Sequence, residues 1–564
     1  MIIPAIAMLL SIVLDMFNPY LSKLMVDNVI TQKQLNLLPI ILISVAGIAL
    51  ARSVLGYFKE FLADYLATEV SKDMKKELFE HIQSLPYSYF DSMNTGELMS
   101  RISEDVDNIW RTISFGFRLF VENLVYFVIA SAILFYYNWI LAAFCVLIMV
   151  PIAYIAMVLE KKAGATYGKI SDQAAEMNTV AQENISGVRL VKAFAREKHE
   201  ILKFLNMNNI NYKLSIEQTN IFGKYFPLIE FLTNLSIVFM ICIGGILVIN
   251  KSITIGTLVA FNGYIWMLIW PMRMLGWLTN MIAQNNASAK RIFKILDTKS
   301  DILSEGNAVE LPEVKGDIKF NAVSFKYNNE EVLKNIDFTA KAGSTIAIMG
   351  ATGSGKSSII NLIGRYYDAS EGSVLVDGHD VKNINLTSLR SQMSVVAQDV
   401  FLYSESIEDN IRLGKENATL EEIIAACKEA CADEFIQELS EGYDTVIGER
   451  GIGLSGGQKQ RISIARALLR DSSILVLDDA SSALDMETEY NLLKNLKNRP
   501  KRPTTFIIAH RISAVKNADM ILFIDNGQVI EKGTHEDLLN LKGKYYEIYC
   551  EQFKDFADLE GEVV

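Results

Sequence analysis

The sequence is short of basic residues and of cysteine. It has 54 Lys and Arg against 66 Asp and Glu, a formal net charge of −12 over 564 residues. This deficit argues against a nucleic-acid-binding protein, because affinity for a duplex depends on Lys and Arg that neutralise phosphates. Of five cysteines, only Cys427 and Cys431 are spaced to share a helix face. No second Cys or His pair lies near them in the sequence, so reduced thiols are favoured over a metal site.

Long apolar runs are abundant up to about residue 290, whereas the remainder has the composition of a soluble protein. The chain is too long for a single core, so at least two domains are expected. The first apolar segment lacks a basic leader and a small-residue cleavage site, and it is interpreted as a membrane helix, not a signal peptide. Six segments reach the length of about 20 residues that crosses a bilayer: residues 2–24, 38–62, 115–137, 139–160, 226–249 and 255–281.

The connections between these segments are of two kinds. Three are short polar loops near residues 31–34, 137–138 and 250–254, and two are long, at 63–114 and 161–225. The long connections are charged and helix-like, which suits helices that continue beyond the membrane, turn and come back. They hold most of the Lys and Arg of the first 300 residues, whereas the short loops carry only Lys33 and Lys251. By the positive-inside rule, the long connections, both termini and the second half are expected in the cytoplasm.

Ionisable residues inside apolar segments are candidates for function. Arg118 and Glu122 are four residues apart and are expected to neutralise each other. Glu230 is the best candidate for contact with a cationic substrate, against a structural hydrogen bond as the alternative. Asp15 and Arg273 complete the set. Neighbouring Met and Trp side chains could form an adaptable apolar site, with helix packing or lipid contact favoured for most of them: Trp266, Met267, Trp270, Met272 and Met274.

The second half contains a phosphate-binding loop. Residues 350–357 read Gly-Ala-Thr-Gly-Ser-Gly-Lys-Ser, between an apolar strand at 344–349 and a helix at 357–363. Glycines let the backbone turn its N–H groups toward phosphates at a helix N-terminus, where the dipole favours negative charge. Lys356 is placed to reach the β- and γ-phosphates, and the Ser357 hydroxyl to bind Mg²⁺. The flanking strand and helix favour this interpretation over a chance glycine-rich turn.

Further motifs lie on both sides of this loop in the sequence. Tyr327 precedes the loop, and its aromatic face can stack on adenine. Residues 454–458, Leu-Ser-Gly-Gly-Gln, are a second glycine-rich turn that opens a helix, which makes a second anion site. Asp478 ends a buried strand, as a Mg²⁺-holding carboxylate should. The other markers are Gln398 and His510, each after an apolar run, and the segment 481–485.

In this order the motifs resemble those of a bacterial ABC exporter half-transporter of the multidrug type, over essentially the whole chain. Residues 448–451 are similar to the exporter subtype, and residues 90–101 and 183–189 to the two cytoplasmic turns that end in coupling helices. The resemblance implies a membrane α-helical bundle of six transmembrane helices with long cytoplasmic extensions, followed by an α/β P-loop ATPase domain. The expected boundaries are 1–300 for the transmembrane domain, 301–316 for a linker and 317–564 for the nucleotide-binding domain.

The resemblance also implies roles for single residues. Two nucleotide-binding domains would sandwich two ATP molecules, with Tyr327 on adenine and His510 on the γ-phosphate of this chain's own ATP. Ser455 and Gly457 would contact the γ-phosphate of the partner's ATP. Mg²⁺ would be held by Ser357, Gln398 and Asp478. The implied ATP-binding positions are Tyr327, Gly350, Ala351, Thr352, Gly353, Ser354, Gly355, Lys356, Ser357, Ser358, Ser455, Gly456, Gly457 and Gln458, and the implied catalytic positions are Asp479, His510 and Gln398.

Asp479 departs from the family pattern, which has a glutamate there to polarise the attacking water. The shorter side chain would withdraw the carboxylate by about 1.5 Å, and misplacement by an ångström can cost about 100-fold in rate. We therefore expect weak hydrolysis at this chain's own site, unless Asp479 acts through a bridging water or a shifted backbone. Because residues 454–458 are intact, they would complete a competent site on a complementary partner. A heterodimer is predicted, and a homodimer with two slow sites is the alternative.

The sequence thus predicts a multi-pass ABC-type transporter ATPase of the cytoplasmic membrane. It would export drugs or other amphipathic molecules by alternating access, with ATP and Mg²⁺ as cofactors. The expected partners are a second half-transporter, the lipid bilayer and a small amphipathic substrate, without nucleic acid. A lipid flippase or an ATP-gated channel on the same scaffold is the alternative, whereas six membrane spans exclude a soluble ATPase.

Overall fold

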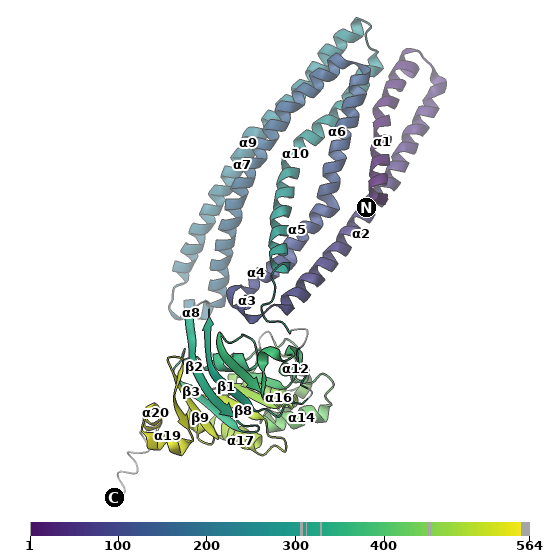
Figure 1. Cartoon of the computed structure of the whole chain (residues 1–564). Helices are drawn as coiled ribbons and strands as arrows, with labels where there is room; N and C mark the ends of the chain where they lie inside the picture. Colours follow the sequence, from purple (N-terminus) through teal and green to yellow (C-terminus); the bar gives the residue numbers. More distant parts are fainter. Residues whose placement is uncertain are drawn as a thin grey trace. The chain divides into compact units, whose positions relative to one another are not determined.

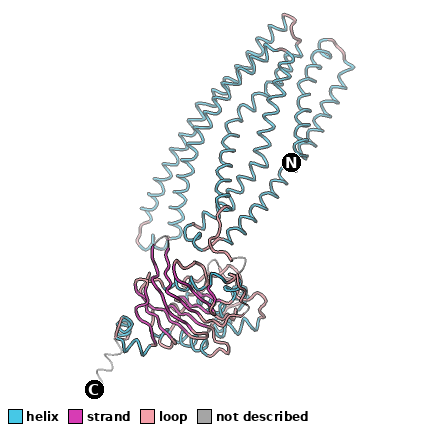
Figure 2. The backbone as a smooth tube through the Cα atoms, in the orientation of Figure 1, coloured by secondary structure: helices cyan, strands magenta, loops and turns pink. Residues whose placement is uncertain are grey.

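The computed structural model describes residues 2–304, 308–311, 313–327, 330–448, 451 and 453–553, traced in Figures 1 and 2. These residues form two compact units. The first unit contains Met1–Ser84 and Met93–Lys299, and the second contains Leu85–Ser92 and Ser300–Val564. The short helix α3 (Tyr87–Ser92) therefore belongs by its contacts to the second unit, although the first unit surrounds it in the sequence.

The described part of the first unit contains six helices that are long and apolar enough to cross a membrane, which confirms the six predicted segments. They extend well past the roughly 20 residues that a bilayer requires, since α9 alone has 53 residues. The main helices are α1 (Ile2–Leu24), α2 (Leu38–Ser84), α6 (Phe117–Tyr137), α7 (Trp139–Ser186), α9 (Glu197–Ile249) and α10 (Ile255–Leu296). Shorter helices lead into α6: α4 (Thr95–Ser100), η3 (Arg101–Asp105), α5 (Val106–Arg111) and η4 (Thr112–Gly116).

The outer surface of these helices is apolar. Only 6% of the residues are buried in the most apolar stretch of the second long helical segment, Leu35–Ser84. Ile43 and Leu50 on this helix are each 71% exposed, and Leu147 on α7 is 67% exposed. Contiguous apolar surface of this kind is unfavourable in water but is solvated by lipid, while the helical backbone satisfies its own hydrogen bonds. These helices therefore form a membrane-spanning bundle.

Two glycines in the long helices differ in the space around them: Gly276 lies at a close helix–helix contact and Gly245 does not. A Cβ added to Gly276 on α10 would lie 2.8 Å from the Glu160 Cβ and 2.9 Å from the Ala156 carbonyl oxygen on α7. A Cβ added to Gly245 on α9 would meet nothing within 4 Å. Small residues at a helix–helix contact let the backbones pack at short range, which is a main source of stability within a membrane.

These two positions provide a matched pair of substitutions. We expect Gly276→Ala to destabilise the protein by about 1–3 kcal/mol, because α7 would have to move to admit the methyl group. Gly245→Ala should leave stability unchanged or raise it by up to about 1 kcal/mol through helix propensity. Thermal unfolding of the detergent-solubilised protein measures both. Equal effects of the two substitutions would contradict the close contact between α7 and α10.

The expected pairing of Arg118 with Glu122 is wrong. Arg118 forms an ion pair with Glu60 at 3.4 Å, and Glu122 forms one with Lys59 at 3.0 Å, both across to α2. Two side chains four residues apart point from the same helix face, so both can reach a neighbouring helix instead of each other. The charges of α6 therefore fix its position against α2.

Two other ionisable residues of the spans are also paired within the unit. Asp15 forms an ion pair with Arg52 and accepts a hydrogen bond from the Tyr126 hydroxyl at 2.9 Å. The Glu230 carboxylate lies 2.6 Å from the Arg273 guanidinium. This pairing favours a structural role for Glu230 over contact with a cationic substrate. Trp266 and Trp270 are 48% and 54% exposed and face away from the core of the unit.

The strands of the second unit, magenta in Figure 2, form two sheets. The smaller sheet is antiparallel, with strand order β2-β1-β4-β5, and the larger is mainly parallel, with order β10-β9-β3-β8-β7-β6. The smaller sheet comprises β1 (Ile318–Tyr327), β2 (Glu330–Ala340), β4 (Glu371–Val376) and β5 (His379–Asp380). The larger comprises β3 (Thr345–Gly350), β6 (Met393–Val396), β7 (Ile474–Asp478), β8 (Thr504–Ile508), β9 (Met520–Asp525) and β10 (Gln528–Gly533). This α/β unit after the helical bundle confirms the predicted fold class.

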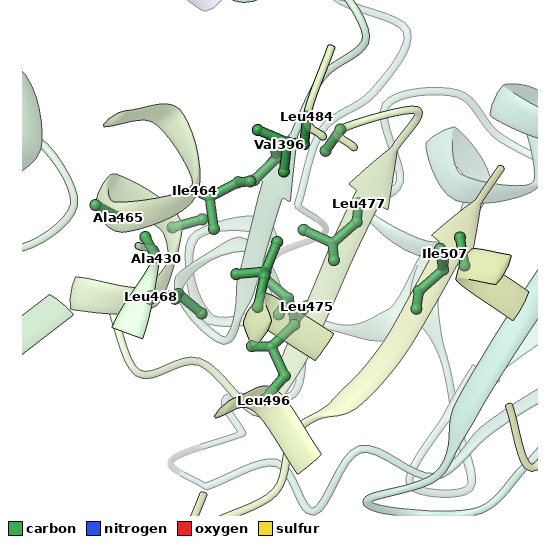
Figure 3. Packing of buried hydrophobic residues seen from close by; sticks show 14 of the residues in the cluster. Val396, Ala430, Ile464, Ala465, Leu468, Leu475, Leu477, Leu484, Leu496 and Ile507 are labelled. Carbon is green, nitrogen blue, oxygen red and sulfur yellow. The ribbon is translucent and has the colours of Figure 1, made fainter. Parts of the chain in front are cut away.

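Alternate residues of the parallel strands face two separate cores. Leu475, Leu477 and Ile507 pack on one face of the sheet, together with Ile464 and Leu468 of α16 (Gly456–Leu469), as Figure 3 shows. The intervening residues, including Val476 and Ile508, belong to the core on the other face. A strand that is buried on both faces must be apolar throughout, which is why these segments appear as continuous apolar runs in the sequence. The carboxyl ends of these parallel strands share one edge, where ligands bind in open α/β sheets.

Candidate nucleotide-binding site

The phosphate loop connects β3 to α11 (Lys356–Ile363). Gly350 and Gly355 have φ angles of +148° and +101°, which L side chains rarely adopt. A Cβ at Gly350 would lie 2.1 Å from the Ile524 carbonyl oxygen, and one at Gly355 would lie 2.6 Å from the Leu333 side chain. Both positions therefore require glycine for conformation and for space.

Lys356 spans this loop from the first turn of α11. Its ammonium donates hydrogen bonds to the carbonyl oxygens of Gly350 at 3.0 Å and Ala351 at 2.7 Å, and the residue is only 8% exposed. Burial lowers the pKa of Lys356, against the opposing charges of Asp478 and Asp479. A desolvated cation is stabilised by a nearby anion more strongly than an exposed one, because water screens it less. The loop is therefore prepared for phosphate.

The Ser354 side chain provides a separate indication of a ligand. It is 5% exposed, and its hydroxyl is buried with no hydrogen-bond partner among the described residues. A buried hydroxyl without a partner costs about 1–3 kcal/mol, and a ligand oxygen that accepted a hydrogen bond from it would remove this cost. A phosphate oxygen could accept a hydrogen bond from this hydroxyl, and the loop residues therefore fit a nucleoside triphosphate.

Asp478 and Asp479 lie at the carboxyl end of β7. Burial raises the pKa of Asp478, although a hydrogen bond from Ser357 and the charges of Lys356 and His510 act in the opposite direction. A carboxylate that is desolvated in this way is stabilised by a cation. Asp478, the Ser357 hydroxyl and the Gln398 amide offer oxygen ligands, the type that Mg²⁺ prefers.

The backbone of Asp479 adopts the left-handed conformation, with φ +48°. Its N–H donates to the Ile508 carbonyl at 3.0 Å, and its own carbonyl accepts from the Ser482 hydroxyl at 2.9 Å. Aspartate and asparagine tolerate this region better than most residues with a side chain. The short side chain at this position therefore also has a conformational explanation, separate from its reach toward water.

One cavity of about 240 Å³ collects most of the predicted residues. The sequence reasoning missed two of its lining residues, Val332 and Ile508, which provide apolar wall. The predicted residues that do not line this cavity are Tyr327, Gly350, Ala351, Ser354 and residues 455–458. The predicted residues that do line it are Thr352, Gly353, Gly355, Lys356, Ser357, Ser358, Gln398, Asp478, Asp479 and His510.

The second glycine-rich turn begins α16. Ser455 caps this helix: its hydroxyl accepts from the Gln458 N–H at 3.3 Å, while the Gln458 side chain accepts from the Ser455 N–H at 2.8 Å. This reciprocal cap fixes the turn with the first N–H groups of the helix at its end. Residues 449, 450 and 452, including part of the 448–451 motif, lie outside the described residues.

Gln460, which sequence reasoning missed, supports the site from behind the turn that carries Asp479. It is 5% exposed, donates to the Asp479 carbonyl at 3.5 Å and to the Ser482 hydroxyl at 3.2 Å, and accepts from the Ala483 N–H at 3.1 Å. It therefore connects α16 with the turn that carries Asp479. Its position two residues after the 454–458 motif is the sequence signal that could have identified it.

Comparison with known proteins agrees with this geometry. Residues 1–272 match the family model of the ABC transporter transmembrane region, and residues 333–482 match that of the ABC transporter. The ATP-dependent lipid A-core flippase of Syntrophus aciditrophicus is 36% identical, over 99% of this chain and 93% of that protein. A putative multidrug export ATP-binding/permease protein of Bacillus subtilis, YgaD, is 35% identical, over 95% of this chain and 93% of that protein.

The solved structure of a bacterial Atm1-family ABC exporter with ATP bound superimposes with a TM-score of 0.84 at 27% identity, and covers 97% of each chain. The fold and the site thus define an ATP-hydrolysing membrane transporter. The chain belongs to the ABC transporter family, as a bacterial exporter half-transporter with a multi-pass transmembrane region and an ATP-binding domain.

Proposed function

We propose that this chain is one subunit of an ATP-driven exporter that moves drugs or other amphipathic molecules out across the cytoplasmic membrane. The observation that carries the proposal is the convergence of Lys356, Ser357, Asp478, Asp479 and His510 on one cavity, in a chain with six membrane-length helices. The names of the multidrug-export and lipid-flippase relatives support an amphipathic substrate. The proposed domains are 1–300, a linker at 301–316 and 317–564, with the nucleotide-binding domain and both termini in the cytoplasm.

In this proposal the predicted residues have separate tasks. Lys356 and the loop N–H groups hold the phosphates, and Tyr327, which lies at the end of β1 outside the cavity, stacks on the adenine. Ser357, Gln398 and Asp478 would hold Mg²⁺, which neutralises phosphate charge when bound. Asp479 orients the attacking water, and His510 contacts the γ-phosphate. Asp478, Asp479 and His510 lie at or just after the carboxyl ends of parallel strands, and α11 carries Lys356 and Ser357.

The partner in this proposal is a second half-transporter. Ser455, Gly456, Gly457 and Gln458 would complete the partner's ATP site, and this chain's own site would hydrolyse slowly because Asp479 is short. The result is a heterodimer with one slow and one competent site. ATP binding would close the two nucleotide-binding domains and switch the transmembrane cavity from inward- to outward-facing.

Substitution of Asp479 tests the reach argument. Asp479→Glu restores the missing methylene and should raise hydrolysis at this site by up to about 100-fold. The left-handed backbone opposes the longer side chain, so the gain is an upper limit. ATP turnover by the purified, assembled transporter is the measurement. Asp479→Asn tolerates the same backbone conformation without the charge, and it should hydrolyse no faster than the unmodified chain.

Two outcomes would contradict the slow-site proposal. One is an unchanged rate in Asp479→Glu together with a further loss in Asp479→Asn, because Asp479 would then already be a competent group. The other is hydrolysis at ordinary exporter rates by the chain assembled with itself alone. That result would favour a homodimer.

A lipid flippase is the second candidate, because a relative with that name is 36% identical over 99% of the chain. Reconstituted transporter separates the two candidates. An exporter of drugs should accumulate a cationic dye in inverted vesicles when ATP is added. A flippase should instead change the leaflet of a fluorescent phospholipid, and ATP-dependent dye accumulation without lipid movement would exclude it.

A further inference from the structure

Two adjacent tyrosines, Tyr366 and Tyr367, hold α3 on the nucleotide-binding unit. They follow α11, the helix that begins at the phosphate loop. The Tyr87 ring of α3 stacks on Tyr366, with 4.6 Å between ring centroids and 12° between planes. The Tyr367 hydroxyl donates a hydrogen bond to the Asp91 carboxylate of α3. One tyrosine therefore holds α3 by its ring and the other by its hydroxyl.

The other side of the Tyr367 ring faces the end of β1. Tyr367 meets Tyr327 edge-on, with 5.0 Å between ring centroids and 78° between planes, and lies 5.6 Å from Phe325. Tyr367 is 9% exposed and Phe325 is 3% exposed, so this contact lies inside a packed region. Tyr327 and Asp91 are thus connected through a single side chain.

The Tyr367 hydroxyl is a constant donor in this arrangement. Burial raises the pKa of Tyr367, and the hydrogen bond with Asp91 raises it further. The proton therefore stays on the hydroxyl throughout the physiological range. Movement of the ring, rather than loss of the proton, is what can alter the bond with Asp91.

We propose that Tyr367 is a positioning residue that transmits the presence of a stacked base from Tyr327 to Asp91, so that α3 responds to the nucleotide base as well as to its phosphates. This rests on the proposed function, in which Tyr327 stacks on adenine. A base against Tyr327 restricts the plane of that ring, and rings packed edge-on in a dense interior adjust together. The hydroxyl is the only polar side-chain atom of Tyr367, and it is hydrogen-bonded to Asp91. Movement of the Tyr367 ring therefore reaches α3.

The ordinary alternative is that Tyr327 only increases affinity and Tyr367 only anchors α3. The two cases differ at saturating nucleotide. If Tyr327 serves affinity alone, a weaker-stacking base raises the concentration for half-saturation and leaves the saturated state of α3 unchanged. If Tyr367 transmits stacking, the saturated state itself depends on the base, since a ligand shifts an equilibrium only through its different affinity for the two states.

Hydrogen–deuterium exchange of the assembled transporter in nanodiscs, with saturating ATP or CTP, separates these cases. The smaller pyrimidine ring of CTP stacks less than adenine and carries the same triphosphate. We expect ATP to slow exchange in the peptide covering residues 85–92 about fivefold more than CTP, the lower end of typical coupling between sites. Protection of the phosphate loop, residues 350–363, should be alike with both nucleotides.

The chain offers matched variants for each contact. Tyr367→Phe keeps the ring and removes the hydroxyl, and Asp91→Ala removes its acceptor; both should abolish the ATP–CTP difference at residues 85–92. Tyr366→Phe removes the neighbouring hydroxyl but keeps the stack on Tyr87, and Asp91→Asn keeps an acceptor oxygen. Both of these variants should retain the difference. Combining Tyr367→Phe with Asp91→Ala should add nothing to either change alone.

Two negative results have different meanings. Protection of residues 350–363 by both nucleotides, with equal protection of residues 85–92, would overturn the role of Tyr367 and leave the proposed function intact. The absence of nucleotide protection at residues 350–363 would instead contradict the proposed function itself. A base-dependent difference that persists in Tyr367→Phe would also overturn the proposal, because the signal would then travel by another route.

Discussion

Replacing Lys356 by alanine is expected to lower ATP hydrolysis at this chain's site by at least about 100-fold, the usual cost of removing one charged or donor group from a reacting centre. The same substitution should leave the stability of the fold unchanged or slightly raised. Lys356 is 8% exposed, and burial lowers its pKa, so holding the charge there costs free energy in the absence of an anion. Lys356 therefore serves the ligand rather than the fold.

Hydrolysis and thermal unfolding of the same preparation test both halves of this expectation. Lys319→Ala is the matched control, because Lys319 is an exposed lysine on β1 of the same unit and should affect neither measurement. A fall in unfolding temperature for Lys356→Ala comparable with its loss of activity would contradict the assignment. It would show that the hydrogen bonds to Gly350 and Ala351 contribute mainly to the fold.

Much of the site could be predicted because its groups follow strands that are apolar throughout. The runs at 344–349, 474–477 and 504–508 contribute to both sheet faces. The first leads into the phosphate loop, the second is followed directly by Asp478, and the third is followed, after Ala509, by His510. Parallel strands align their carboxyl ends, so the order of motifs in the sequence is enough to bring Lys356, Asp478 and His510 to one edge. Local chemistry and one topological rule determine this part of the structure.

Other features of the structure depend on contacts between residues that are far apart in the sequence. Arg118 and Glu122 are neighbours on α6, yet each pairs with a residue of α2 about 60 positions away, as the separations of 58 and 63 residues show. The bond between Tyr367 and Asp91 joins residues 276 positions apart. The left-handed backbone of Asp479 is equally hidden, since aspartate occurs in many conformations. Spacing along the chain therefore predicts neither the two ion pairs, nor the hydrogen bond, nor the backbone conformation of Asp479.

The Asp105 carboxylate also depends on residues that are distant in the sequence. Asp105 ends η3, is 2% exposed, and accepts hydrogen bonds from Ser288 at 2.7 Å and from the Arg291 Nε at 2.9 Å on α10. Arg101, one turn earlier, donates at 3.2 Å. Two guanidinium groups thus share one buried carboxylate, which attaches the segment before α6 to the C-terminal part of α10.

Asp105→Ala is therefore expected to destabilise the protein by about 3 kcal/mol, the lower end of the cost of breaking a buried ion pair. The lower end applies because the Arg291 side chain is 41% exposed, so water can partly solvate the cation left behind, whereas Arg101 is 19% exposed. Asp105→Asn keeps an acceptor for Ser288 and should lose less. Glu104→Ala removes an exposed acid one residue away and should change stability by less than about 0.5 kcal/mol. Thermal unfolding in detergent ranks the three variants, and equal unfolding temperatures for Asp105→Ala and Glu104→Ala would show that the buried cluster positions the helices without stabilising them.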